Sequence, residues 1–537
     1  MTGLFYGTII CEFVESRAHY GNKIIEQVIM QGYVLPTNYT ERNLDLGFST
    51  AKAATVIQRL KQEAKGPVIQ IENGDFIQGS PLSYYVRKND VKVAADLTKV
   101  LNYLGYDLGI LGNHEFNYGL DYLREAITSY NHPILCANIL TKDGKPAFGE
   151  PYKVFEKEGV KVAVLGITTP YIPNWEQPAT VKDLVFVSAL ETAKKYVPEM
   201  RKVADIVVVT YHGGFECDLS CGDPTELLTG ENEGYAIATQ VEGIDALVTG
   251  HQHRVIAQKV NGIPVIQPGY RGAYVGEISL QVEKVDGKYT VVSSEAKLHP
   301  TEEVPADPKV VEMFSDLQAE VEDWLDTTVG TVVGDMTIKD PHEARLKEHP
   351  YVEFINKVQM DASGADISGT ALFNNDGRGF SSEIRMRDVI TNYIYPNTLA
   401  VLKVSGADLK AALERVATYF IVENGKAVFN PKYVEPKPQF YNYDMYEGIE
   451  YTLDFTRPFG DRVTRLDYHG KPVQPTDELE VVANQYRAVG GGNYSMFKPE
   501  KIVREVQIDM TELIAEYLRK HPVIEATVNN NFKTVVK

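Results

Sequence analysis

The chain contains few cysteines and no long apolar segment. Among its 537 residues only Cys11, Cys136, Cys217 and Cys221 occur, and they are scattered along the sequence. This excludes a disulfide-rich scaffold and predicts free thiols in a reducing compartment. The spacing of Cys217 and Cys221 is not that of a zinc knuckle. No stretch approaches the roughly 18 consecutive apolar residues of a membrane-spanning helix.

Basic residues are also in deficit. With 54 Lys and Arg against 73 Asp and Glu, the formal net charge is −19. This argues against a nucleic-acid polymer or an anionic membrane as the main partner. The first 22 residues include Glu12 and Glu15 and lack a basic n-region and a small-residue cleavage site, so we expect a cytoplasmic protein, with export left open. The length predicts two or more domains, without internal repeats.

Four short polar segments next to glycine follow apolar runs. They are Asn73-Gly74-Asp75, Gly112-Asn113-His114-Glu115, His212-Gly213-Gly214 and Gly250-His251-Gln252-His253. The preceding runs, such as 206–210 and 244–248, predict buried strands that end where the polar residues begin. Mixed Asp, Asn and His donors favour a borderline divalent ion such as Mn, Zn, Fe or Co over Ca or Mg. One such histidine alone is more often an ordinary loop residue, but four sites in series favour a metal centre.

At these residues the chain resembles the calcineurin-like metallophosphatases, and over most of its length it is similar to the 5′-nucleotidase and 2′,3′-cyclic-nucleotide phosphodiesterase family. The resemblance implies an α/β fold, a four-layer αββα sandwich followed by a second α+β domain. It also implies two divalent metal ions that share the carboxylate of Asp75. The second metal would be bound by Asn113, His212 and His251, and the first by His253. His114 matches the catalytic histidine of the family.

One departure from the family concerns the first metal. Members open their first strand with a D-x-H motif, but counting back from Gly32 these positions hold Ile29 and Gln31. Isoleucine cannot bind a metal, and Gln31 offers only a weak neutral oxygen, so we expect a poor first site. Either the protein has drifted toward a mononuclear or inactive form, or residues 1–31 reflect a reading-frame error ahead of an intact enzyme. We favour the second explanation, because the change is abrupt and every later ligand is present.

A second departure is Asn117, which stands where many 5′-nucleotidases carry an aspartate that orients the catalytic histidine. Asn117 can hold the imidazole of His114 by a hydrogen bond, but it cannot stabilise an imidazolium as a carboxylate does. We therefore predict His114 and Asn117 as the catalytic pair, with weakened general-acid strength. The asparagine is also consistent with the cyclic-phosphodiesterase branch.

The sequence divides near residue 325. We predict a metallophosphatase domain over 1–305, a linker helix over 306–328 and a 5′-nucleotidase-type substrate-binding domain over 329–537. Pro308 suits the first turn of the linker helix. Apolar residues then recur at helical spacing: Val310, Met313, Leu317, Val321 and Leu325.

The second half contains two kinds of substrate-binding signal. The segment around Asn374 and Arg378 resembles the part of the family that contacts the nucleotide, although a plain turn explains it equally well. The segments 441–448 and 490–494 resemble those that stack aromatic rings on a nucleobase, which favours Tyr443 and Tyr494. In a chain with 32 tyrosines, ordinary packing is the alternative for both.

Together these features predict metal-dependent hydrolysis of nucleotide phosphate esters, as a 2′,3′-cyclic-nucleotide 2′-phosphodiesterase and 3′-nucleotidase with a weakened first metal site. Water would attack phosphorus directly, without a covalent intermediate. A 5′-nucleotidase or a nucleotide-sugar hydrolase is an alternative that shares these residues. A catalytically impaired nucleotide-binding protein is a third, suggested by Ile29 and Gln31. An adhesion role has no wall anchor or repeat to support it.

Overall fold

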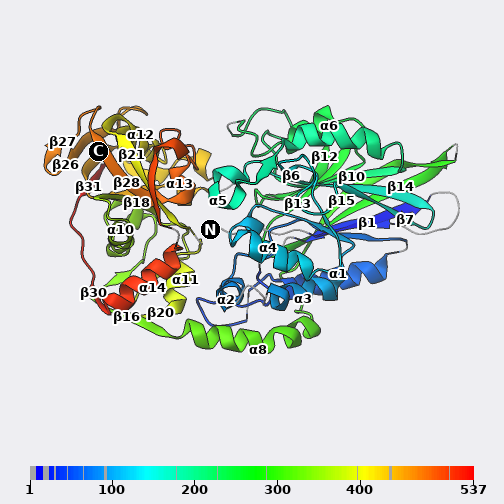
Figure 1. The fold of residues 1–537 in the computed structure, drawn as a ribbon, viewed down its shortest axis with the longest axis horizontal. Helices are drawn as coiled ribbons and strands as arrows, with labels where there is room; N and C mark the ends of the chain where they lie inside the picture. Colours follow the sequence, from blue (N-terminus) through cyan, green and yellow to red (C-terminus); the bar gives the residue numbers. More distant parts are fainter. Residues whose placement is uncertain are drawn as a thin grey trace. The chain divides into compact units, whose positions relative to one another are not determined.

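A computed structural model describes most of the chain in two compact units. The described residues are 8–15, 23–28, 32–44, 46–64, 66–89, 94–176, 178–226, 228–285, 287–395, 397–434, 438–506 and 508–537. Ile29 and Gln31 lie outside them. The division falls between Val321 and Glu322, within helix α8 (Pro308–Leu325). Figure 1 shows the helices and strands of both units.

The first unit contains a seven-stranded sheet in the order β15-β14-β1-β2-β3-β4-β5. Strands β2 to β5 run parallel to one another, whereas β1 pairs with β14 in parallel and with β3 in antiparallel orientation. The strand bounds are Thr8–Glu15 (β1), Lys23–Val28 (β2), Ile69–Glu72 (β3), Leu108–Ile110 (β4), Ile134–Leu135 (β5), Tyr274–Val285 (β14) and Lys288–Pro300 (β15).

A second sheet of the same unit has six strands in the order β12-β13-β11-β10-β8-β7. Its four inner strands are parallel, and the edge strands β7 and β12 are antiparallel to their neighbours. The bounds are Tyr152–Lys157 (β7), Val160–Thr168 (β8), Ile206–His212 (β10), Ala246–Thr249 (β11), Val255–Val260 (β12) and Ile263–Pro268 (β13). Every residue of β10 is buried, as expected for a parallel strand covered on both faces.

The two sheets pack face to face around one apolar core, to which Ile71 and Ile110 contribute from the first sheet and Val164 and Val208 from the second. Helices α6 (Ala189–Met200) and α7 (Gly234–Gln240) cover the outer face of the second sheet. Helices α1 (Thr50–Glu63), α3 (Ala94–Leu104) and α4 (Gly119–Thr128) lie on the side of the first sheet (Figure 1). The predicted αββα sandwich is confirmed.

The second unit is an α+β domain, as predicted. Its main sheet has the order β24-β18-β28-β21-β29, with bounds Asp444–Glu447, Ile367–Ala371, Glu478–Asn484, Leu399–Ser405 and Ile502–Val506. Helix α10 (Pro350–Ser363) packs on β18 and on α14 (Met510–Lys520). Pro350 occupies the first turn of α10, and Gly364 ends the helix with a left-handed backbone (φ 71°), a conformation that glycine adopts without strain.

Helix α8 occupies the region predicted for the linker helix. At its first turn the carboxylate of Asp307 accepts hydrogen bonds from the backbone N–H groups of Lys309 and Val310. At its other end Arg387 forms an ion pair with Glu322. The helix is therefore capped within the first unit and held by an ion pair within the second. The exact domain boundaries, 305 and 329, stay predictions. Among the described residues, no helix is long and apolar enough to cross a membrane.

Candidate active site

The predicted metal ligands lie where parallel strands end. Asp75 follows β3, and Asn113 follows the neighbouring strand β4; His212 ends β10, and His251 follows its neighbour β11. The structure brings these four side chains together. His212 Nε2 lies 3.1 Å from Asp75 Oδ2, His251 Nδ1 lies 2.9 Å from Asn113 Oδ1, and the two imidazole centroids are 5.7 Å apart.

The contact between His212 and Asp75 fits a metal site. The Nδ1 atom of His212 lies 2.7 Å from the backbone oxygen of Asn73, and because a carbonyl only accepts, Nδ1 carries the proton. In a neutral imidazole Nε2 then presents a lone pair to Asp75 Oδ2. Both atoms are buried, and neither has a hydrogen bond of acceptable geometry. Two facing lone pairs in a buried site need a cation between them, which a shared metal ion would supply and which a proton on His212 Nε2 supplies otherwise.

Three of the predicted ligands have strained backbones. Asp75, His251 and His253 have φ values of 63°, 65° and 67°, in the left-handed region that non-glycine residues seldom adopt. Such strain, of order 1–3 kcal/mol per residue, is typical of functional sites, where the surrounding structure holds the side chain in place. The ring of His253 stacks on that of Tyr270, with centroids 5.3 Å apart.

Neighbouring glycines are required by close packing. A Cβ atom on Gly112 would lie 2.1 Å from Asp75 Oδ1, and one on Gly74 would lie 2.2 Å from the backbone nitrogen of Gly112. The loops after β3 and β4 therefore touch backbone to backbone. A side chain at Gly112 would displace the carboxylate of Asp75, and a side chain at Gly74 would push the two loops apart.

Glu115 is a scaffold residue of this site for which the sequence analysis assigned no role. Its buried carboxylate accepts hydrogen bonds from the backbone N–H groups of Asp75 (2.5 Å), Phe76 (2.5 Å) and Gly112 (2.7 Å). It thus ties together the loops that follow β3 and β4. Burial, and next the negative charge of Asp75, raise the pKa of Glu115 to about 8. Its position beside His114 in the glycine-flanked segment was the signal that could have identified it.

His114 and Asn117 also meet in the structure. His114 starts a single 3-10 turn (His114–Phe116), and its backbone N–H donates to Asp75 Oδ1 at 2.7 Å. Its ring nitrogen Nδ1 lies 2.6 Å from Asn117 Oδ1. The other end of the amide donates from Nδ2 to Glu176 Oε1 at 2.5 Å. Burial raises the pKa of Glu176 to about 7, although the hydrogen bond from Asn117 lowers it. The sequence analysis did not identify Glu176.

Two neighbours contact the imidazole of His251. Its Nε2 lies 3.0 Å from Glu231 Oε1, and the ring of Trp175 is tilted against it with centroids 5.3 Å apart. A carboxylate on the far nitrogen of a ligating histidine fixes its tautomer and raises its basicity. Glu231 therefore has the position of an outer-sphere partner.

The predicted polar substrate contacts lie in a turn of the second domain. Asn374 is buried, and its Oδ1 accepts from the backbone N–H groups of Asp376 (2.9 Å) and Gly377 (2.6 Å). This is the geometry of a side chain that organises its own turn. Arg378 is exposed, and its backbone oxygen accepts from Ile338. Contact of either side chain with a substrate stays a prediction.

The two predicted base-stacking tyrosines are enclosed by neighbours from their own domain. Tyr443 is 1% exposed and packs edge-on against Phe420 (5.1 Å, 86°). Tyr494 is 0% exposed, and the guanidinium of Arg487 lies 3.9 Å above its ring. A base could reach these rings only after they are uncovered, so their role stays a prediction.

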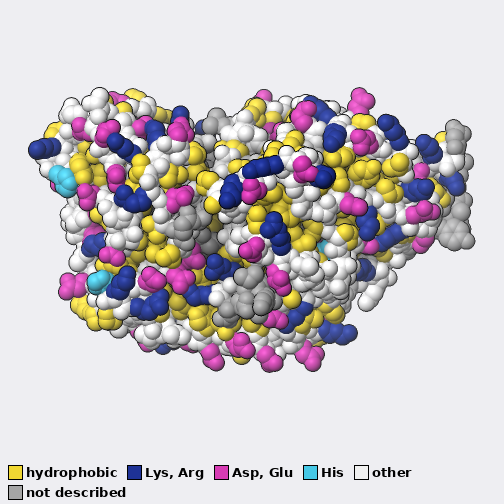
Figure 2. All heavy atoms as spheres, in the orientation of Figure 1, with side chains coloured by type: hydrophobic (Ala, Val, Ile, Leu, Met, Phe, Trp, Pro, Cys, Tyr) yellow, Lys and Arg dark blue, Asp and Glu magenta, His cyan; other side chains and the backbone are white. Residues whose placement is uncertain are grey.

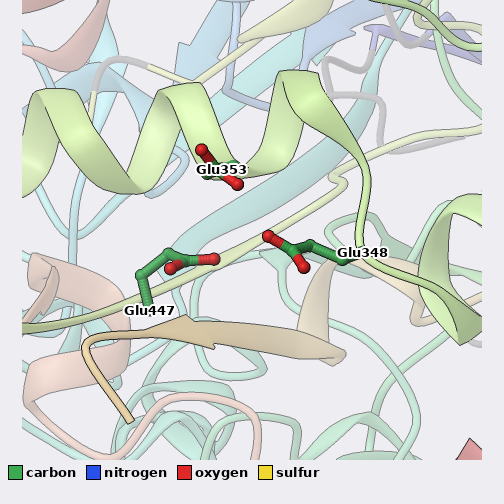
Figure 3. Close-up of side chains that lie close together, drawn as sticks. All are labelled: Glu348, Glu353 and Glu447. Atoms are coloured by element: carbon green, nitrogen blue, oxygen red, sulfur yellow. The ribbon is translucent and has the colours of Figure 1, made fainter. Parts of the chain in front are cut away.

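A separate acidic cluster lies in the second domain. Glu348, Glu353 and Glu447 have carboxylate oxygens within 4.8 Å of one another and turn toward a common point (Figure 3). Protein groups already contact them: Lys357 pairs with Glu353, and Asn529 donates to Glu348 (2.7 Å) and to Glu447 (2.8 Å). Burial, followed by the hydrogen bond and charge of Glu353, raises the pKa of Glu348 to about 7. Burial also raises the pKa of Glu447 to about 7.

Comparison with known proteins identifies the family. The sequence matches the calcineurin-like phosphoesterases over residues 45–255 and the 5′-nucleotidase C-terminal domain over residues 328–499. A 2′,3′-cyclic-nucleotide 2′-phosphodiesterase/3′-nucleotidase of Salmonella typhimurium is 30% identical over 541 residues, covering 87% of this chain and 81% of that protein. The chain belongs to the family of calcineurin-like phosphoesterases with a 5′-nucleotidase C-terminal domain. It is therefore a phosphoester hydrolase of a class that uses divalent metal ions.

Two further relatives agree with this assignment. A Staphylococcus aureus protein, provisionally assigned as a 5′-nucleotidase and solved with α-ketoglutarate, is 38% identical and superposes with a TM-score of 0.88, covering 98% of this chain and 100% of that one. The trifunctional nucleotide phosphoesterase of Bacillus subtilis is 27% identical over 548 residues, which cover 90% of this chain. The chain spans only 37% of the length of that relative.

Replacing Asp75 by asparagine tests its role as the shared ligand. Asp75→Asn keeps the shape and removes the charge, so we expect metal affinity to fall by at least about 100-fold, since even outer partners of metal ligands are worth about 10–100-fold. Titration with Mn²⁺ followed by elemental analysis measures the loss. Asp121→Asn, which removes an exposed carboxylate in the first turn of α4, is the matched control. Unchanged Mn²⁺ binding in Asp75→Asn would contradict the assignment.

The acidic cluster predicts a pH-dependent stability of the second domain. An unfolded glutamate titrates near pH 4.3, and the folded Glu348 and Glu447 titrate at about 7. Between about pH 4.3 and pH 7 the folded state therefore binds more protons than the unfolded state. The two raised pKa values contribute to the stability of the second domain at low pH, and this contribution is lost as the pH rises through about 7. Glu353 has a lowered pKa and stays ionised throughout this window.

We expect the melting temperature of the second domain to fall from pH 5 to pH 8, and to fall less in Glu447→Gln. Calorimetry at both pH values measures the two differences. Glu525→Gln, at an exposed position of strand β30 (Val523–Glu525), should behave as the parent protein. Equal pH dependence of Glu447→Gln and the parent would show that the cluster does not titrate in this range.

Proposed function

We propose that this protein hydrolyses phosphate esters of nucleotides with the aid of divalent metal ions, as a 2′,3′-cyclic-nucleotide 2′-phosphodiesterase and 3′-nucleotidase. The observation that carries the proposal is the meeting of Asp75, Asn113, His212 and His251 where parallel strands of the two sheets end. The similarity to the Salmonella enzyme over most of both chains supports the choice of substrate class.

The donor set assigns ligands to the metals. Asn113, His212 and His251 would hold one ion, His253 would hold the other, and Asp75 would be shared by both. Bound divalent ions neutralise the phosphate and lower the pKa of a coordinated water. Mixed nitrogen and oxygen donors favour Mn, Zn, Fe or Co. Because asparagine and neutral histidine bring no charge, the site remains attractive to an anionic substrate.

The protein's own groups orient the reacting ester. The half-buried ring of His114 is held through Nδ1 by Asn117, which directs Nε2 away from that hydrogen bond. With Nδ1–H held by Asn117, the doubly protonated ring also has an Nε2–H, which can donate to a phosphoryl oxygen or to the leaving oxygen. On the face drawn in Figure 2, acidic and basic side chains are interspersed. With a net charge of −19 overall, attraction of an anionic substrate then depends on the positive charge of the metal centre.

The second domain would bind the base and sugar. Asn374, Arg378, Tyr443 and Tyr494 remain our candidates for these contacts. Because Tyr443 and Tyr494 are enclosed, we add a half-buried tyrosine that precedes the segment 490–494, Tyr486 in helix α13 (Gln485–Ala488). It lies over Gly491, where an added Cβ would meet its ring at 2.6 Å. Stacking on such a ring contributes about 1–3 kcal/mol per base and tolerates every base.

A second candidate function is 5′-nucleotidase activity, favoured by the match to the Staphylococcus aureus structure over its whole length. The purified protein, loaded with Mn²⁺, should be given 2′,3′-cyclic AMP, 3′-AMP, 5′-AMP and UDP-glucose, and its products separated by chromatography. We expect 2′,3′-cyclic AMP and 3′-AMP to be consumed fastest. Preferential hydrolysis of 5′-AMP would establish the second candidate instead. Binding of nucleotide without turnover would establish the impaired form suggested by Ile29 and Gln31.

Restoring the family motif tests the first metal site. In Ile29→Asp/Gln31→His two strong ligands replace one weak one, so we expect Mn²⁺ content to rise from about one ion toward two and turnover to rise sharply. Elemental analysis and initial rates on 2′,3′-cyclic AMP measure both. Ile29→Asn/Gln31→Asn provides a polar control without strong ligands. If the restored motif changes neither metal content nor rate, the register assigned to these positions is wrong.

A further inference from the structure

Asn117 connects the catalytic histidine to a buried carboxylate. His114 Nδ1 lies 2.6 Å from Asn117 Oδ1, and Asn117 Nδ2 donates to Glu176 Oε1 at 2.5 Å. Glu176 is 7% exposed. The three groups thus form a continuous chain in which the amide has an acceptor on one side and an imidazole on the other.

Glu176 decides which way the amide of Asn117 faces. When Glu176 is ionised its carboxylate only accepts hydrogen bonds, so Nδ2 turns toward Glu176 and Oδ1 toward His114, as in the structure. An oxygen beside Nδ1 in turn requires the proton of His114 to sit on Nδ1. Without Glu176 the amide could rotate by half a turn and present Nδ2 to the ring, which would favour the opposite tautomer. The tautomer of His114 is therefore set from the far side of Asn117.

Local packing fixes the position of Glu176. Its backbone N–H donates to the oxygen of Ile172 at 3.0 Å, so it closes the turn that begins there. Ile172 is fully buried and belongs to the same apolar cluster as Phe116, the last residue of the turn that His114 begins. Both turns consequently rest on one core, and Glu176 is placed relative to His114 by packing and not by the hydrogen-bonded chain alone.

We propose that Glu176 is a positioning residue for His114, acting through Asn117 to fix the orientation and the tautomer of its ring. The proposal rests on the proposed function, in which His114 holds a proton toward the phosphate ester. It revises the expectation from the sequence that Asn117 leaves the histidine without a carboxylate. The carboxylate is present one hydrogen bond further away, where its effect on the ring is weaker than direct contact but still felt in a buried site.

Three variants separate the contributions of the hydrogen-bonded groups Glu176, Asn117 and His114. Glu176→Leu removes both the acceptor and the charge; Glu176→Gln keeps an acceptor and loses the charge; Asn117→Asp/Glu176→Gln moves the carboxylate into direct contact with His114. Because positioned general acid–base groups contribute about 100- to 10,000-fold, we expect kcat to fall by about 100-fold in Glu176→Leu and by less in Glu176→Gln. KM should stay within about twofold, because general acid–base catalysis lowers the barrier in the transition state. The exchanged pair should recover most of the lost kcat.

A spectroscopic readout makes the test independent of turnover. In protein labelled with ¹⁵N-histidine, the His114 signals, assigned by their loss in His114→Gln, should report Nδ1–H in the parent and a mixture of tautomers in Glu176→Leu. Glu216→Gln is the matched control, since this carboxylate also accepts backbone hydrogen bonds, from Tyr235 and Ala236, away from His114. Melting temperature and Mn²⁺ content should be compared across the series.

The outcomes distinguish the two proposals. Parent-like kcat and tautomer in Glu176→Leu would overturn the role of Glu176, as would an exchanged pair no faster than Glu176→Gln. If Glu176→Leu does not fold, Glu176→Gln and the exchanged pair decide. If the parent protein hydrolyses no nucleotide, the proposed function fails, while the tautomer of His114 still tests whether Glu176 controls it.

Discussion

A buried carboxylate with too few donors is the constraint on which this site depends. Asp75 is fully buried, and its Oδ1 is satisfied by the backbone N–H of His114. Its Oδ2 faces the Nε2 atom of His212, whose own proton is committed to Asn73 on the other side of the ring. Burying a charge without compensation costs several kcal/mol, so this arrangement requires positive charge at that point, either from a bound metal ion or from a proton on His212 Nε2. The geometry therefore suits a cation that replaces that proton.

The surrounding structure holds this unfavourable arrangement in place. The carboxylate of Glu115 draws the loops after β3 and β4 together, and the absence of side chains at Gly74 and Gly112 lets the two backbones touch. Positive φ at Asp75 then turns its carboxylate toward the second sheet. The core between the sheets fixes the strands, the strands fix the loops, and the loops fix the ligands. Catalytic geometry is in this sense a consequence of sheet packing.

Sequence patterns predicted the parts that depend on local order. Apolar runs followed by glycine and a polar residue identified the strand ends, and the carboxyl ends of parallel strands had to meet at one edge. What the sequence could not supply was the identity of distant partners. Glu176 lies 59 positions from Asn117, and no periodicity indicates that its carboxylate reaches that amide. Burial was equally hard to foresee, since Tyr443 and Tyr494 stand in polar, glycine-rich segments and are nevertheless enclosed.

On the register assigned from the sequence, Ile29 and Gln31 would weaken one metal site more than the other. Strand β2 runs parallel to β3, so its carboxyl end faces the same edge as the loop that carries Asp75. The ligands assigned to the second ion come from other strands and are complete. With a single ion bound, the one negative charge of the shared carboxylate would be wholly available to it, which strengthens its binding. The net positive charge left to attract and polarise a phosphate ester would then be smaller, because one divalent ion brings half the charge of two. Such a site would favour retention of metal and binding of nucleotide over turnover, and would separate the two properties that a complete pair of ions combines.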